Sequence, residues 1–303
     1  MVDNRPISKS IPVELKTISN WTFAARMATW AGILVAGGIL TAGSAPLTVA
    51  LGIVILGIGI AHGVELCHQA LHNTGFTHPR LNEIIGMALG LPLLVSFYEY
   101  RISHLAHHKN VGTPEDTEYF DYGERPLTFR QFLATLSMRQ HYMRFFRNFG
   151  LFLTDRPIPG VREKHQPTLR RYYIAVIGFV VLLGAIGILT GTGWRPILTW
   201  IAAMVLVAGP VHALIEFPEH YKCNAQTKDV LHNTRSIQTG WFMTWFTNGN
   251  NFHVEHHMYP TVPLQNARQI HDILYPDHAY HNNGYREFYI SLFRDMRQGG
   301  QRA

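Results

Sequence analysis

The sequence predicts an all-α integral membrane protein with four transmembrane helices in two hairpins and a helical cap on one side of the membrane. Three observations support this fold. Long stretches contain no Asp, Glu, Lys or Arg, small residues and proline divide these stretches, and three histidine clusters lie outside them. Charged residues make up only 15% of the chain, against about 25% in soluble proteins. The composition therefore excludes an ordinary soluble domain.

The first uncharged stretch is long enough for two membrane crossings. It covers residues 27–64, which as one helix would reach about 57 Å, nearly twice the ~30 Å thickness of a hydrocarbon core. The segment TAGSAP at 41–46 contains the small residues and proline of a turn. We expect spans at about 27–43 and 47–64.

A second pair of spans is predicted at about 172–190 and 196–215. The segment GTGWRP at 191–196 provides its turn, and Arg195 is the one charged residue between 172 and 215. The N-terminal arm is more basic, with Arg5, Lys9, Lys16 and Arg26. Because positive charge accumulates on the cytoplasmic side, both termini are expected in the cytoplasm, at the inner or plasma membrane if the source is bacterial.

The remaining segments are predicted to form one cap, over 65–171 and 216–303, within a single domain of residues 1–303. The apolar stretch 84–98 would reach only about 22 Å as a helix, too short for a crossing. We expect it to be a buried or interfacial helix, because a crossing there would place the first two histidine clusters on opposite sides of the membrane. Residues 131–153 mix Arg and Phe as an amphipathic surface helix does.

Charge and cysteine content narrow the possible partners. The net charge of +6 in a chain with apolar spans favours an anionic membrane surface over nucleic acid. Cys67 and Cys223 are too few to predict a disulfide. The first ~25 residues have no apolar core or cleavage site of a signal peptide, so we expect no cleaved leader.

The three histidine clusters read HQALH at 68–72, HLAHH at 104–108 and HVEHH at 253–257. Residues three and four apart share one face of a helix, so each cluster can direct its imidazoles toward one point. Imidazole suits iron, zinc, copper and nickel, which leaves the metal open. The number of donors favours a pair of ions, because one ion needs fewer than eight. The predicted ligands are His68, His72, His104, His107, His108, His253, His256 and His257.

His220 is a ninth candidate ligand. It follows the fourth span in EFPEH at 216–220, at the membrane depth expected for the three clusters. Glu216, four residues earlier, is either an orienting partner of a ligand or a charge at a helix end. The other histidines are expected to be hydrogen-bonded or exposed: His62, His78, His141, His165, His212, His232, His271, His278 and His281.

Polar residues near the clusters are candidates for orienting the ligands, because metal-bound histidines usually donate their second N–H to a carboxylate or carbonyl. The sequence does not say which of them do so, and for each a solvated surface role is the alternative. They are Glu65, Asp116, Glu118, Glu255, Asn248, Asn250 and Asn251. The patterns HExxH, GxSxG, GxGxxG and GxxxxGK[ST] do not occur, so hydrolase and nucleotide-binding functions lose their usual support.

From about Gly63 to His271, these motifs resemble the membrane fatty-acid desaturase superfamily, which includes hydroxylases, carotenoid oxygenases and decarboxylases. The resemblance includes NTR at 233–235 and NFHVEHHMYPTVP at 251–263. It implies two Fe ions held by the eight histidines and His220, with O2 as co-substrate and two external electrons. The implied reaction attacks an unactivated C–H bond of a lipid or acyl chain.

Some departures narrow the branch of this superfamily. Front-end desaturases tend to carry a fused cytochrome b5 domain with the haem motif HPGG and a glutamine at the start of the third cluster. Here HPGG is missing and the third cluster opens with His253. The first cluster has three intervening residues, whereas acyl-CoA Δ9 enzymes have four. The third cluster is similar to that of bacterial desaturases of acyl lipids.

Desaturation is the expected reaction, with hydroxylation or oxidative decarboxylation on the same scaffold as the alternative. The electron donor would be a ferredoxin, rubredoxin or cytochrome b5, docked by Lys109, Arg144 and Arg147, although these residues could instead meet lipid headgroups. A histidine-rich metal transporter is disfavoured, because the predicted spans carry ionisable residues only near their ends, at His62 and His212. A purely structural membrane protein would leave the clustered histidines unexplained.

Overall fold

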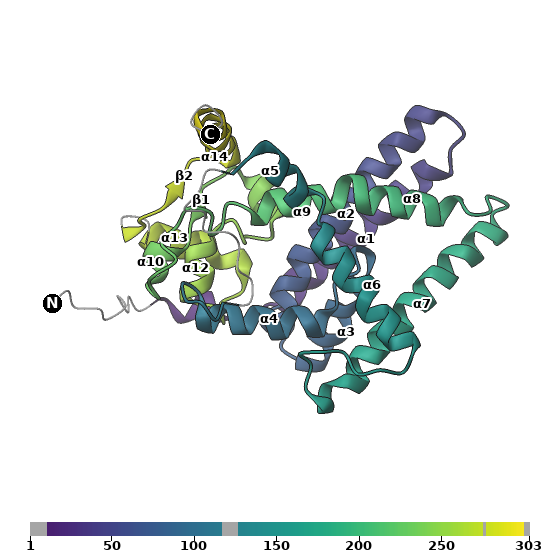
Figure 1. The fold of residues 1–303 in the computed structure, drawn as a ribbon, viewed down its shortest axis with the longest axis horizontal. Coiled ribbons are helices and arrows are strands. Elements are labelled where there is room, and N and C mark those ends of the chain that lie inside the picture. Colours follow the sequence, from purple (N-terminus) through teal and green to yellow (C-terminus); the bar gives the residue numbers. More distant parts are fainter. Residues whose placement is uncertain (1–10, 117–126, 275–276, 300–303) are drawn as a thin grey trace.

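The computed structural model describes residues 11–116, 127–274 and 277–299 of the chain (Figure 1). The elements are almost all helices. In chain order they are η1 (Val13–Lys16), α1 (Asn20–Ala42), α2 (Pro46–Leu71), α3 (Pro79–Gly90), η2 (Leu91–Leu93), α4 (Phe97–Asn110), α5 (Phe129–Leu136), α6 (Arg139–Leu153), η3 (Glu163–His165), α7 (Gln166–Leu189), α8 (Arg195–Ala203), η4 (Met204–Ala208), α9 (Gly209–Glu216), α10 (Val230–Asn233), β1 (Ser236–Ile237), α11 (Trp241–Phe246), α12 (His253–Met258), η5 (Leu264–Asn266), α13 (Ala267–Leu274), β2 (His281–Asn282) and α14 (Tyr285–Gly299).

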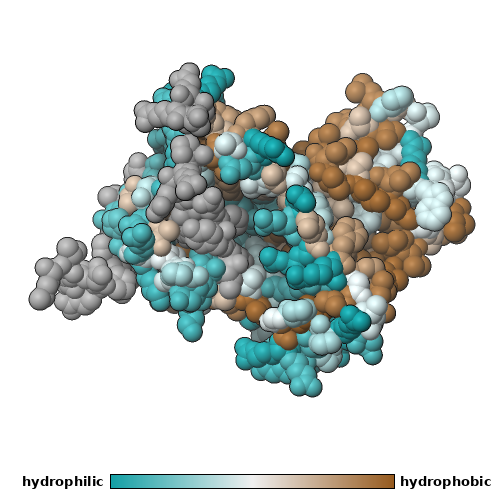
Figure 2. All heavy atoms as spheres, viewed as in Figure 1, coloured by the Kyte–Doolittle hydropathy of each residue, from teal (hydrophilic) through white to brown (hydrophobic). Residues whose placement is uncertain are grey.

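Four of the helical stretches are long and apolar enough to cross a membrane. They cover Asn20–Ala42, Pro46–Leu71, Glu163–Leu189 and Arg195–Glu216. Large apolar side chains along them are exposed, as at Leu47, Val181 and Leu189. Figure 2 shows these side chains gathered over the part of the molecule formed by α1, α2, α7 and α8, while hydrophilic side chains cover much of the rest. The protein is therefore a membrane protein, because an apolar surface of this extent needs lipid around it.

The first two long helices pack closely through glycines. A Cβ atom on Gly52 would lie 2.7 Å from the backbone nitrogen of Thr41, and one on Gly37 would lie 2.9 Å from the backbone nitrogen of Leu56. Small residues allow such close approach of helices where lipid removes the hydrophobic driving force. Arg195, from the turn between α7 and α8, donates hydrogen bonds to the carbonyls of Ala42 and Gly43. The two turns therefore lie together at one end of the helices.

The last long helix contains one π-helical turn. The stretch Arg195–Glu216 runs through α8, η4 and α9, and η4 is π-helical. Pro210 follows this turn and has no N–H to donate to the carbonyl four residues earlier. A π-turn before the proline accommodates the missing hydrogen bond without ending the helix.

The predicted helix over 84–98 is divided in the structure. α3 ends at Gly90, a 3-10 turn follows, and α4 begins at Phe97. The two helical parts form an angle of 99°. Pro92 and the left-handed conformation of Leu94 (φ 59°) account for the break. Residues 131–153 are similarly divided into α5 and α6, with Met138 left-handed (φ 48°) between them.

The polar part of the molecule consists of α4 and the segments after α9, on the left side of Figure 1. Two apolar clusters hold it together, one including Phe132, Phe217 and Phe288, the other including Val262 and Ile270. The two short strands pair in parallel, with Ser236 beside His281 and Ile237 beside Asn282. This pairing brings residues 281–282 next to the segment that follows α10.

Candidate metal centre

All nine candidate ligands converge in the structure, although they come from four separate segments. His68 lies on α2 with His72 at its C-terminal end, three histidines lie on α4, His220 lies in the turn after α9, and three lie on α12. They form two groups. Within each group, the candidate ligand atoms all lie within 4.8 Å of one another. The first group is His68, His72, His104, His108 and His256, and the second is His107, His220, His253 and His257.

The second and third sequence clusters are each divided between the two groups. This differs from the expectation that every cluster directs all its imidazoles to one point. Successive residues on a helix are about 100° apart around its axis, so the adjacent residues His107 and His108 cannot face the same ion. Histidines four apart, such as His104 and His108, lie only about 40° apart and stay in one group.

The spacing of the ring nitrogens fits metal coordination. In the first group, the Nε2 atom of His68 lies 2.7 Å from that of His104 and 3.0 Å from that of His256. In the second, His257 Nε2 lies 3.2 Å from His107 Nε2 and 3.1 Å from His253 Nε2. Two nitrogens bound at about 2.1 Å to one ion, at right angles, would lie about 3.0 Å apart. Both groups therefore have the geometry of ligands sharing an ion.

Burial keeps these imidazoles in the neutral form that binds metals. Burial and neighbouring histidines lower the pKa of His104, His256 and His257 well below the ordinary value. Burial likewise lowers the pKa of His220 to about 3. The Nε2 atom of His72 is buried without a hydrogen-bond partner among the described residues. A bound cation would give this nitrogen an electrostatic partner.

Hydrogen bonds to the second ring nitrogen orient three of the four histidines of the second group. His107 Nδ1 lies 2.7 Å from Asp116 Oδ1, and His253 Nδ1 lies 3.1 Å from Asn250 Oδ1. His220 Nδ1 lies 3.0 Å from the carbonyl of Asn233. Each contact places the N–H on Nδ1 and leaves Nε2 as the donor to a metal. Two of the candidate orienting residues, Asp116 and Asn250, thus contact ligands directly, while Glu118 lies outside the described residues.

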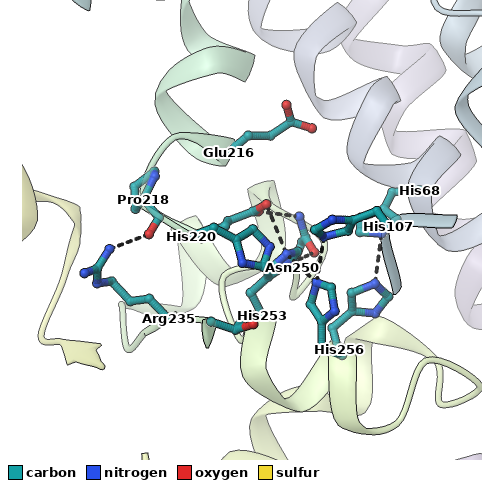
Figure 3. A network of polar contacts seen from close by, with 12 residues as sticks. His68, His107, Glu216, Pro218, His220, Arg235, Asn250, His253 and His256 are labelled. Carbon is teal, nitrogen blue, oxygen red and sulfur yellow. Dashed lines mark hydrogen bonds and ion pairs between the residues drawn. The ribbon is translucent and has the colours of Figure 1, made fainter. Parts of the chain in front are cut away.

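The NTR segment supports the turn that carries His220. Arg235 donates to the carbonyls of Pro218 and Tyr221, at 2.6 and 2.8 Å. Its backbone N–H donates to the carbonyl of Glu219 at 2.8 Å. Figure 3 shows Arg235 reaching this turn beside His220. The sequence motif at 233–235 therefore has a physical role, which is to hold His220 toward the other ligands.

Glu219 is a site residue that the sequence reasoning missed. Its Oε2 lies 3.2 Å from His253 Nε2, the atom that faces the second group, and its other oxygen accepts from Asn250 at 2.9 Å. It adds a carboxylate beside four neutral imidazoles. Its place directly before His220 in EFPEH was the available signal.

Glu216 contacts His212 rather than His220. The Nε2 atom of His212 lies 3.2 Å from Glu216 and its Nδ1 lies 3.3 Å from Glu65. Glu65 lies on α2, which extends further toward the site than the predicted span, and His212 and Glu216 lie on α9. The Asn248 amide donates to the carbonyl of Glu65 and to Gln69, and the Asn251 amide donates to the carbonyl of Ile237. These two asparagines therefore fix the backbone around the ligands.

Two cavities have α9, the helix that precedes His220, in their walls. The larger, of about 660 Å³, is lined by apolar and aromatic side chains of α9, α11 and α14, among them Leu214, Phe246 and Tyr289. The smaller, of about 360 Å³, has polar walls that include His212 and Tyr100. The ring of Tyr100 lies 6.0 Å from that of His68 and 5.5 Å from that of His104, between centroids. Tyr100 therefore lies between the wall of the polar cavity and the first histidine group.

Comparison with known proteins agrees with this geometry. The fatty acid desaturase family matches residues 44–289. An acyl-lipid (9-3)-desaturase of Physcomitrium patens is 27% identical over 68% of this chain and 43% of its own length. A Delta(12) fatty acid desaturase of Calendula officinalis is 24% identical over 70% of this chain and 62% of its own.

A sphingolipid delta(4)-desaturase of Drosophila melanogaster is 27% identical over 76% of this chain and 68% of its own length. The chain thus spans about half to two thirds of the length of these relatives. The family match covers most of the chain, including all three histidine clusters and His220. The chain belongs to the fatty acid desaturase family, whose members are oxidoreductases.

Proposed function

We propose that the protein is an O2-dependent di-iron oxidoreductase that attacks an unactivated C–H bond of a lipid acyl chain, and that its reaction is desaturation. The observation that carries the proposal is the pair of buried histidine groups, in a chain that also contains an apolar cavity of acyl-chain character. Two Fe ions would be held by His68, His72, His104, His108 and His256 on one side and by His107, His220, His253 and His257 on the other. When bound, they would supply the oxidising power that a saturated carbon requires.

The chain's own residues orient the substrate and exclude water. We propose that the acyl chain occupies the apolar cavity, whose volume lies in the range typical of ligand sites. Its wall includes α9 and α11, the helices that lead to His220 and to the third histidine cluster. A chain held there would lie in a pocket with mainly apolar walls, which exclude water. The polar cavity beside Tyr100 would receive the polar end of the lipid.

Glu219 and Asp116 provide negative charge next to the second group. Two divalent ions bound by nine neutral imidazoles would leave four positive charges buried, and buried charge is costly unless it is compensated. Glu219 lies against His253 and Asp116 against His107. We propose that these two carboxylates compensate part of the charge and hold the ligands in the required orientation.

The proposed topology is a single domain of two membrane hairpins with a cytoplasmic cap. The joined turns at Gly43 and Arg195 would then lie on the far side, and the helical pair α3 and α4 would stay on the cytoplasmic side. Lys109, Arg144 and Arg147 are exposed. We propose that they receive an electron carrier of the ferredoxin, rubredoxin or cytochrome b5 type.

Lipid analysis tests the reaction. The full-length protein and His256→Ala would be expressed in cells that supply saturated acyl lipids, with His232→Ala as the control because His232 is exposed and far from the nine ligands in the sequence. Mass spectrometry should find products lighter by two hydrogens with the wild-type protein and the control, and none with His256→Ala. An added oxygen atom in the product would instead identify a hydroxylase, and an unchanged lipid profile would contradict the proposal.

A further inference from the structure

A third cluster of potential metal ligands lies outside the nine histidines. Glu255, His271 and His278 place candidate ligand atoms within 4.8 Å of one another. Glu255 Oε1 lies 2.6 Å from His271 Nδ1 and 3.2 Å from His278 Nε2, and all three side chains are at most 2% exposed. These separations fall near the range found between ring nitrogens of the two histidine groups.

The donor set has the composition of known metal sites. Two imidazoles and one carboxylate bind zinc in hydrolytic enzymes and Fe(II) in non-haem oxygenases. The second oxygen of Glu255 accepts a hydrogen bond from Ser236 Oγ at 2.6 Å. Ser236 in turn accepts from the backbone N–H of Val254 at 3.0 Å. Ligating carboxylates are usually held by hydrogen bonds of this kind.

The fold places another imidazole, that of His281, next to the cluster. The parallel pairing of β1 and β2 places His281 opposite Ser236. The ring centroid of His271 lies 5.6 Å from that of His281 and 5.2 Å from that of His278. Neighbouring rings within the nine-histidine centre have comparable separations, such as 5.3 Å between His68 and His72. Segments before α11 and after α13 thus meet at Glu255.

Glu255 faces away from the histidine groups. On α12 it is two residues from both His253 and His257, which corresponds to about 200° around the helix axis. A cation bound to Glu255 therefore shares no ligand with the two histidine groups. It would connect the back of α12 to α13 and to the segment 277–282.

We propose that Glu255, His271 and His278 bind a third divalent cation of the zinc or ferrous class, with the ring of His281 stacked against His271. The site is buried, which keeps bulk solvent away from the three ligands. Its role is to fix the helix that carries the third histidine cluster. This inference concerns cation binding alone and does not depend on the reaction proposed above.

Zinc titration tests the site in the full-length protein. The protein in detergent is freed of metal by a chelator and titrated with Zn²⁺, and the bound ions per chain are counted by mass spectrometry at saturation. The variant His278→Gln keeps a hydrogen-bonding side chain next to Glu255 but removes an imidazole ligand. We expect three ions in the wild-type protein, two in His278→Gln and three in the control His232→Gln, whose histidine is exposed beside Asp229.

The possible results separate the alternatives. Equal numbers of ions in the wild-type protein and His278→Gln would overturn the proposal and leave the cluster as a hydrogen-bond network. If His278→Gln does not fold, as judged by gel filtration and circular dichroism, His271→Gln replaces it in the same comparison. A failure of the nine-histidine centre to bind metal would appear separately. In that case His256→Ala would bind as many ions as the wild-type protein.

Discussion

Replacing Asp116 with asparagine tests whether a carboxylate beside His107 strengthens metal binding. The two side chains are buried, with exposures of 0% and 1%, and the His107 Nδ1 to Asp116 Oδ1 distance is 2.7 Å. Asparagine has nearly the same shape and its carbonyl oxygen still accepts the N–H. The substitution therefore removes the charge and preserves the hydrogen bond and the packing.

The expected loss follows from the difference between charged and neutral hydrogen bonds. A hydrogen bond to a charged group contributes about 1.5–3 kcal/mol, and one between neutral groups about 0.5–1.5 kcal/mol. The midpoints of these ranges differ by about 1.25 kcal/mol, which corresponds to a little under tenfold in an equilibrium constant. Orienting partners of metal-bound histidines typically contribute about 10–100-fold to metal affinity. We expect Asp116→Asn to weaken binding at the second histidine group by about tenfold.

Competition with a chromophoric chelator measures this affinity in detergent, with Zn²⁺ as the probe. The chain provides a matched control, because His232 Nδ1 and Asp229 Oδ2 form the same kind of contact at 2.8 Å with side-chain exposures of 55% and 46%. Asparagine at Asp229 should change metal binding by less than about twofold, since solvent screens exposed pairs. Equal effects of Asp116→Asn and Asp229→Asn, or no effect of either, would refute the role given to Asp116.

Three further changes test other parts of the structure. Glu219→Gln should weaken the binding of one ion by about tenfold and slow product formation, and wild-type behaviour in both measurements would exclude the charge-compensating role. Leu214→Trp fills part of the apolar cavity and should shift the products toward shorter acyl chains in gas chromatography, whereas an unchanged profile would place the substrate elsewhere. Gly52→Val adds a Cβ only 2.7 Å from the Thr41 backbone and should cost about 1–3 kcal/mol, seen as a lower melting temperature. Gly38→Ala, where a Cβ meets nothing within 4 Å, should not lower it, and equal melting temperatures for the two variants would contradict the close packing of α1 and α2.

Uncharged stretches predicted four long apolar helices because burial of charge in lipid is costly and leaves a visible pattern. The same criterion placed the end of the second helix too early. The predicted span 47–64 stops before the charged residue Glu65, yet α2 continues to Leu71. Glu65 and His68 can extend this helix because they face other protein groups, His212 and His104. Such tertiary partners are not visible in local composition.

The break between α3 and α4 was equally hard to predict. Residues 84–98 are apolar throughout, and Pro92 alone can produce a kink instead of a break. The left-handed Leu94 and the hydrogen bond from Val95 N–H to the carbonyl of Gly90 redirect the chain by 99°. This change of direction brings α4 alongside the end of α2, and thus His104 next to His68. The geometry of the site depends on this break as much as on the histidine spacing.

The division of the nine ligands follows from helix geometry once the helices are placed. An HxxHH pattern has one pair four residues apart, about 40° around the axis, and a third histidine about 100° from its neighbour. One ion can accept the pair, while the third imidazole must face elsewhere. In α4 the pair joins the first group and His107 joins the second, whereas in α12 the pair joins the second group and His256 joins the first. The two helices divide their ligands in opposite ways, so each group receives two ligands from one helix and one from the other, three in all. His68 and His72 complete one group and His220 the other, which explains why the pattern calls for a lone histidine beyond the three clusters.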